Sequence, residues 1–87
     1  MQEKWLKCRV GPGMFSDESA VTVNTVAALA TELRSLFVAD EYVRPDRISD
    51  EGHVRVRVFQ RGTTWWAVLP NDEQEAIPVR SADLEPA

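Results

Sequence analysis

Apolar and polar residues alternate along much of this chain, which is typical of β-strands that pack one face on a core. The clearest segment is residues 54–59, VRVRVF, where the valines point to one side and the two arginines to the other. Residues 63–69, TTWWAVL, follow after Arg61-Gly62, a short connection of the kind that joins antiparallel strands. We therefore predict a β-hairpin over residues 54–69.

Shorter segments with the same alternation predict further strands. In residues 4–10, KWLKCRV, the side chains of Leu6, Cys8 and Val10 share one face. Residues 19–23 and residues 76–79 are short and rich in β-branched residues. Turn residues separate these segments at Gly11-Pro12-Gly13, at Arg44-Pro45-Asp46, at Ser49-Asp50-Glu51-Gly52 and at Pro70-Asn71-Asp72.

Residues 25–38 allow two interpretations. One is a single helix, because apolar residues recur at helical spacing and Asn24 or Thr25 could cap it. The other keeps the chain extended through AVTVNTVAAL, turns at residues 30–32 and returns as LRSLFV. The β-rich sequence on either side narrowly favours the second interpretation.

Length and composition complete the fold prediction. The 87 residues are 44% hydrophobic and 28% charged, which suits one globular domain with one modest core. We predict a single domain over residues 1–87. Its class is mainly β, a small barrel of five to six antiparallel strands, with the helix near residues 25–38 as the open alternative.

Two segments resemble the second half of an SH3 domain: GTTWWAVLP at residues 62–70 and AIPVRSADLEP at residues 76–86. In that family a tryptophan pair opens one strand, and a later strand runs through a short 3₁₀-like turn into the last strand. The resemblance implies an SH3-like barrel with this turn within residues 79–83, with Leu84 pointing inward and Trp65 facing a ligand.

The resemblance is confined to residues 62–85. The acidic loop and the ALYDY-type opening of SH3 domains have no counterpart in this chain. The proline and tyrosine that line the SH3 peptide groove are also missing around Ser81-Ala82. Binding of a proline-rich peptide therefore remains one option among several.

The tryptophan pair is the most prominent candidate for a binding site. Adjacent strand residues point to opposite faces, so one tryptophan belongs to the core and the other to the outside or to an edge. The outer one either covers an incompletely closed barrel end or anchors a protein partner. We predict a small interaction module that binds a protein or peptide through Trp65, Trp66, Tyr42, Arg55, Arg57 and Arg61.

Arginines that share a strand face with an aromatic residue also resemble a sheet that binds RNA or single strands by stacking. The net charge of −4 counts against this alternative. Residues 62–87 are the acidic part of the chain, with Arg80 alone against Asp72, Glu73, Glu75, Asp83 and Glu85. A third interpretation is a structural domain that self-associates as a homodimer through an edge strand or its apolar end.

Catalytic and metal-binding signatures are absent from the sequence. The only histidine, His53, and the only cysteine, Cys8, lie far apart, and a buried structural role fits Cys8 better than a nucleophile. The carboxylates fall in expected loops rather than in a motif. We therefore predict no enzymatic activity, no metal and no cofactor. Without a signal-like or membrane-length apolar run, a cytoplasmic location is the expectation.

Overall fold

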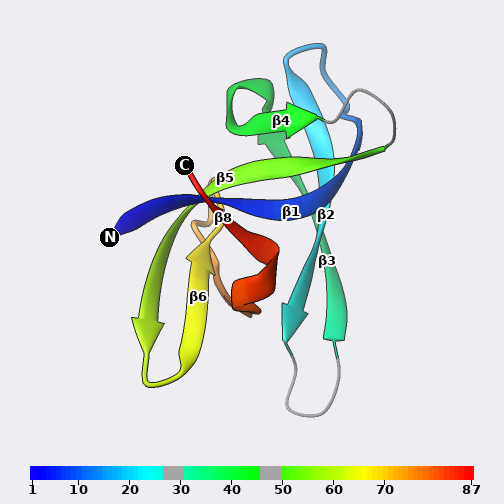
Figure 1. Ribbon diagram of the computed structural model, residues 1–87. Helices are drawn as coiled ribbons and strands as arrows, with labels where there is room; N and C mark the ends of the chain where they lie inside the picture. Colours follow the sequence, from blue (N-terminus) through cyan, green and yellow to red (C-terminus); the bar gives the residue numbers. More distant parts are fainter. Residues whose placement is uncertain (27–30, 46–49) are drawn as a thin grey trace.

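The computed structural model describes residues 1–26, 31–45 and 50–87, and this part of the chain is mainly β (Figure 1). Two 3₁₀ turns, Asp40–Tyr42 and Ser81–Asp83, interrupt the strands. The strands are β1 (Gln2–Pro12), β2 (Glu18–Val26), β3 (Thr31–Ala39), β4 (Val43–Pro45), β5 (Glu51–Arg61), β6 (Thr64–Val68), β7 (Ala76–Val79) and β8 (Leu84–Pro86).

One antiparallel sheet runs in the order β3-β2-β1-β5-β6-β7, with β4 added on β5 and β8 added on β1. The long strands β1 and β5 hold the sheet together, because different parts of each pair with different neighbours. β1 pairs with β5 from Gln2 to Arg9, and it pairs with β2 from Cys8 to Pro12. The sheet curls into a half-barrel, in which the Thr25 hydroxyl of β2 donates to the Pro78 carbonyl of β7 at 2.8 Å.

The core lies inside this curl and follows the predicted alternation. Val54, Val56 and Val58 are buried, while the arginines between them reach the other face. The predicted hairpin over residues 54–69 is confirmed as β5 and β6, joined by a turn in which Gly62 has a φ of 59°. The core includes Leu6, Cys8, Val21, Val23, Val38, Val54, Val56, Val58, Ala67, Leu69, Ile77 and Val79.

The helix considered for residues 25–38 does not form. Its residues belong to the end of β2 and to β3, which pair from Glu18↔Ala39 to Val26↔Thr31, while residues 27–30 lie outside the described part. The interpretation with two strands is therefore the correct one, although β3 already begins at Thr31, inside the expected turn. No described helix is long and apolar enough to cross a membrane.

The chain end agrees with two details that the SH3 resemblance implied. A 3₁₀ turn occupies Ser81–Asp83, and Leu84 after it is partly buried against the core. β8 then pairs with β1 at Lys4, Trp5 and Leu6. Membership of the SH3-like class itself stays a prediction.

Candidate partner-binding surfaces

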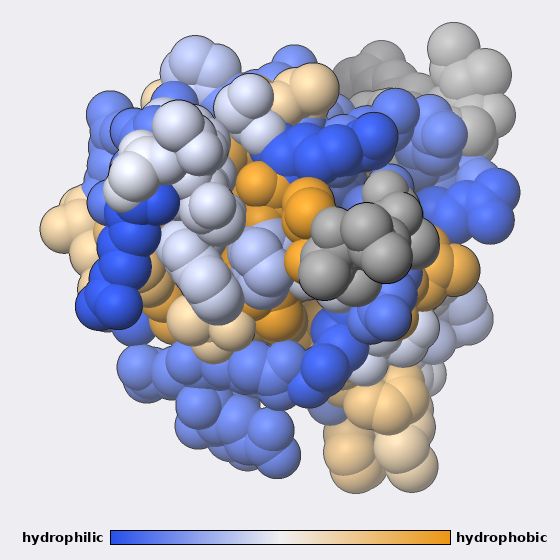
Figure 2. Space-filling model, turned by 90° about the horizontal axis from the view of Figure 1, so that it is seen from below, coloured by the Kyte–Doolittle hydropathy of each residue, from blue (hydrophilic) through white to orange (hydrophobic). Residues whose placement is uncertain are grey.

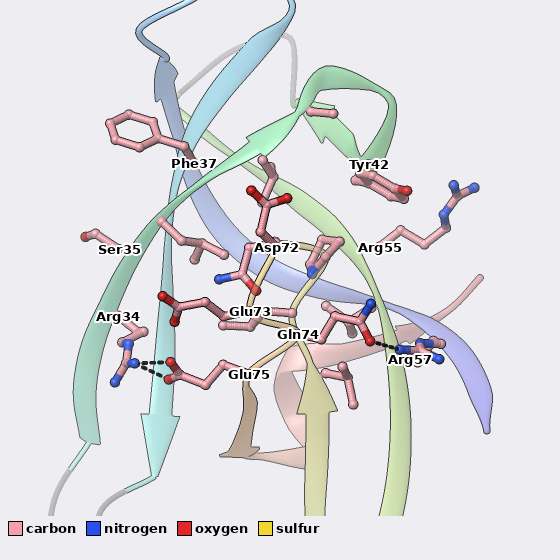
Figure 3. Close-up of a pocket in the computed structure, with 18 of the residues that line it drawn as sticks. Arg34, Ser35, Phe37, Tyr42, Arg55, Arg57, Asp72, Glu73, Gln74 and Glu75 are labelled. Atoms are coloured by element: carbon pink, nitrogen blue, oxygen red, sulfur yellow. Dashed lines mark hydrogen bonds and ion pairs between the residues drawn. The ribbon is translucent and has the colours of Figure 1, made fainter.

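A polar cleft of about 990 Å³ opens between β3 and β5, and the loop from β6 to β7 crosses it (Figure 3). Three segments far apart in the sequence line it: Arg34–Ala39 of β3, Arg55–Arg57 of β5, and Val68–Glu75 at the loop. Tyr42 of the first 3₁₀ turn adds an aromatic ring. The volume of the cleft is that of an ordinary ligand pocket. Its many charged groups distinguish it from a pocket that is mainly apolar.

On the β3 side, strand alternation determines which side chains face the cleft interior. Arg34, Leu36 and Val38 lie opposite Val23, Val21 and Ser19 of β2, so they share the core-facing side of the hairpin. Val38 is buried and Leu36 is half-buried, but the Arg34 guanidinium reaches across and forms an ion pair with Glu75 (Figure 3). This pair connects β3 to the loop.

The loop at residues 70–75 is held in a compact shape by its own backbone. Gln74 donates its N–H to the Asn71 carbonyl at 3.0 Å and adopts a left-handed φ of 48°. Leu69, which is buried, donates to the Glu75 carbonyl at 2.9 Å and anchors the loop to the core. Asp72 and Glu73 are consequently presented from a fixed turn, and both are exposed.

On the β5 side of the cleft, Arg55 and Arg57 each interact with a neighbouring side chain. The Arg55 guanidinium lies 5.4 Å from the centre of the Tyr42 ring, a cation–π arrangement. Arg57 donates to the side-chain oxygen of Gln74 at 3.2 Å. Both arginines lie along one side of the cleft, and the carboxylates of Asp72, Glu73 and Glu75 occupy its middle and opposite side (Figure 3).

A second surface lies on the outer face of β5 and β6. Phe59 and Trp66 are register partners whose rings are nearly parallel, with centroids 6.3 Å apart and an interplanar angle of 5°. The Arg61 guanidinium lies 5.7 Å from the Phe59 ring centre. Pro78 of β7 pairs with Trp66 from the other side. We call Phe59, Arg61, Trp66 and Pro78 the outer strip.

Trp65 points the other way. It shares its face with buried Ala67 and Leu69, packs against the core, and has the Lys4 ammonium 5.8 Å from a ring centre. This is the reverse of the orientation that the SH3 resemblance implied, since Trp66 is the outer tryptophan. Figure 2 shows the molecule from the end that lies at the bottom of Figure 1, and apolar side chains are visible there within a hydrophilic rim.

The predicted binding residues are divided between the two faces of the β5–β6 hairpin: Arg55, Arg57, Arg61 and Trp66 share its outer face, whereas Trp65 points toward the core. Tyr42, Arg55 and Arg57 meet in the cleft, Trp66 and Arg61 belong to the outer strip, and Trp65 packs against the core. Sequence reasoning missed the loop carboxylates as site residues, together with Arg34 as their partner. The acidic run after Pro70 was the available signal, but nothing in the sequence placed it beside β3.

His53 and Cys8 lie on opposite faces of the sheet. Cys8 is in the core, whereas His53 pairs in register with Lys7 and its Nε2 lies 2.5 Å from Glu85. A Cys–His nucleophile pair is therefore not assembled. Glu85 also pairs with Arg44 at 3.3 Å, which ties β4, β5 and β8 together. Among the described residues, no three or more metal-ligating side chains are grouped to hold an ion.

Comparison with known proteins adds no relative to this description. No protein-family model matches the chain, and no curated protein or solved structure matches it either.

Proposed function

We propose that this chain is a small non-enzymatic interaction module that binds a basic, extended segment of a protein partner in the cleft. The observation that carries the proposal is the pair Asp72 and Glu73. Both carboxylates are exposed on a compact loop at the cleft, and neither has a hydrogen-bond or ion-pair partner within residues 1–26, 31–45 and 50–87.

The charge balance of the cleft supports a cationic partner. Arg34 is paired with Glu75, Arg57 is hydrogen-bonded to Gln74, and Arg55 lies against Tyr42. The negative groups at the loop are therefore the ones with unused hydrogen-bonding capacity. An arginine or lysine of a partner can satisfy them with charge-assisted hydrogen bonds.

The apolar residues of the cleft support a peptide rather than a small cation. Leu36 is half-buried, and Tyr42 presents a ring beside Arg55. These side chains can take the aliphatic stems and apolar residues of an extended segment, whose side chains alternate in direction. The cleft spans several residues of β3, which suits a segment of similar length.

The double variant Asp72→Asn with Glu73→Gln is expected to weaken binding of a labelled peptide of Arg-Leu-Ser repeats about tenfold. The physical reason is the loss of two charged acceptors without a change in side-chain size. Fluorescence anisotropy measures the dissociation constant. A Glu-Leu-Ser peptide should not bind the unchanged chain, because the loop carboxylates repel it.

The matched control is Asp17→Asn with Glu41→Gln. It makes the same change in net charge at two exposed carboxylates that do not line the cleft. Binding should change no more than about twofold, as expected for exposed, salt-screened charges whose side chains do not line the cleft. Equal losses in the two double variants would mean that only net charge matters, and the cleft would not be the site.

The outer strip supports a second candidate function, weak binding of single-stranded nucleic acid. Phe59 and Trp66 offer aromatic surface and Arg61 offers a cation beside it, the elements of a stacking platform. A mobility shift with oligothymidine at low salt, lost steeply as salt rises, is the expected result. The absence of any shift at low salt would remove this candidate.

A further inference from the structure

β3 is the end strand of the sheet and has one unpaired edge. It pairs with β2 along all nine residues, and no other described strand pairs with it. In Figure 1 it lies at the flank of the molecule, with no further strand beyond it. An end strand of this kind presents a row of free backbone N–H and C=O groups to any strand that approaches.

The two ends of the sheet differ in how well they resist such pairing. β7 has only four residues, includes Pro78, and contacts β2 through the Thr25 hydroxyl. Short strands and prolines are common protection for an edge. β3 has nine residues and no proline, and Leu33 and Phe37 on its outer face are 72% and 48% exposed. Its edge is therefore suited to pairing.

We propose that the β3 edge pairs with β3 of a second copy of this chain, antiparallel, with the two-fold axis at Ser35. Ser35 is the midpoint of Thr31–Ala39, so this register pairs the strand along its whole length. Leu33 then lies opposite Phe37 of the second copy, and Phe37 lies opposite its Leu33. Cross-strand apolar pairs of this kind stabilise a sheet, and they cover the most exposed apolar side chains of the strand.

We assign the pairing strand to a second copy of this chain because β3 is complementary to itself. Leu33 and Phe37 are equally distant from Ser35, and a two-fold axis requires such symmetry. Moving the axis to Arg34 would place two guanidinium groups directly opposite one another. Moving it to Leu33 would leave the residues after Ser35 without partners within the strand. The Ser35 axis avoids both penalties.

Two positions on the outer face of the β2–β3 hairpin, Ser35 and Thr22, allow the proposal to be tested and controlled. Ser35 is exposed, and its hydroxyl lies 3.1 Å from that of Thr22, its register partner on β2. A charge at position 35 would meet its own copy across the axis, where opposed like charges destabilise. A charge at position 22 lies one strand further from the axis. Both lysine variants lose the same hydroxyl contact.

Sedimentation equilibrium over a range of concentrations measures the association. The unchanged chain should form dimers, Ser35→Lys should raise the dimer dissociation constant at least about tenfold, and Thr22→Lys should leave it within about twofold. An equimolar mixture of Ser35→Lys and Ser35→Glu should recover the dimer, because opposite charges then face one another at the axis. Circular dichroism establishes that each variant keeps its strands.

Three results would overturn the proposal. The first is an unchanged chain that stays monomeric up to millimolar concentration. The second is folded Ser35→Lys protein that dimerises as tightly as the unchanged chain. The third is an equal loss in Ser35→Lys and Thr22→Lys. Residues 34–39 of β3 also line the cleft, so the two proposals are separated by their variants. Sedimentation of Ser35→Lys tests the dimer, and peptide binding by the Asp72→Asn, Glu73→Gln variant tests the cleft.

Discussion

Replacement of Leu6 by alanine is expected to lower the free energy of unfolding by about 3 kcal/mol. Leu6 is fully buried, and on β1 it pairs with Val54 of β5 and with Leu84 of β8. The substitution removes apolar contact at a position where three strands meet, and the surrounding backbone is fixed by pairing on both sides. The cavity that remains can therefore collapse only in part.

The size of this loss matters because a domain of this length has a total stability of only roughly 4–13 kcal/mol. Urea unfolding followed by tryptophan fluorescence measures the change. All samples should be compared at one protein concentration, because pairing of copies would shift the midpoint by mass action. Met14→Ala is the control, since Met14 is 75% exposed and its truncation should cost less than about 0.5 kcal/mol.

A small effect at Leu6 would contradict the described core. If Leu6→Ala and Met14→Ala unfold at the same urea concentration, β1 cannot lie between β5 and β8 with its alternate residues inward. The slope of the transition should stay the same, because the cavity does not change the surface that unfolding exposes. A changed slope would instead indicate altered compactness of the native or unfolded chain.

Alternation predicts the strands well wherever only one face is apolar. The valines of β5 are inside and its arginines are outside, as the sequence indicated. The same rule assigned Leu6 and Cys8 to the core. Side-chain direction in a strand has a period of two, so a segment that is apolar only at alternate positions has one way to bury them.

The ambiguity at residues 25–38 has a physical origin in β3. Leu36 and Val38 face the inside of the hairpin, whereas Leu33 and Phe37 are exposed on its outer face. A strand with apolar residues on both faces loses the period of two. Residues 33, 36 and 37 then imitate the spacing of a helix. The exposed apolar residues that obscured the strand are the ones that the proposed dimer would cover.

The cleft could not be predicted, because it depends on which strands become neighbours. Its walls come from residues 34–39 and from residues 68–75, and only the curl of the sheet brings these segments together. The orientation of the tryptophan pair also required the register. Pairing of Trp66 with Phe59 on the outer face fixes Trp65 on the core side.

Replacement of Gly52 by alanine is expected to destabilise the fold by about 2–3 kcal/mol. Gly52 is buried on β5, where it pairs with Cys8 of β1 and with Pro45 of β4. A methyl group there would lie 2.8 Å from the Arg44 carbonyl oxygen and 2.9 Å from the Pro45 Cα. Both are backbone atoms of β4, so they cannot rotate away, and β4 must shift from β5.

A shift of β4 should also change the shape of the cleft. Tyr42 directly precedes β4 and places its ring against Arg55, so displacement of β4 moves this part of the wall. We therefore expect Gly52→Ala to weaken binding of the Arg-Leu-Ser peptide even where the protein remains folded. Urea unfolding measures the first effect, and anisotropy below the unfolding transition measures the second.

Gly11→Ala is the matched control, since it makes the same chemical change in β1, the neighbouring strand. A Cβ on Gly11 meets no heavy atom within 4 Å, so the substitution should be neutral or slightly stabilising by reducing the freedom of the unfolded chain. The difference between the two alanine variants measures the crowding at Gly52, to which β4 contributes two backbone atoms and Val10 contributes its Cγ2 at 2.9 Å. If Gly52→Ala is as stable as Gly11→Ala and binds the peptide normally, β4 does not lie against β5 at this distance, and Tyr42 is not held in the cleft by that contact.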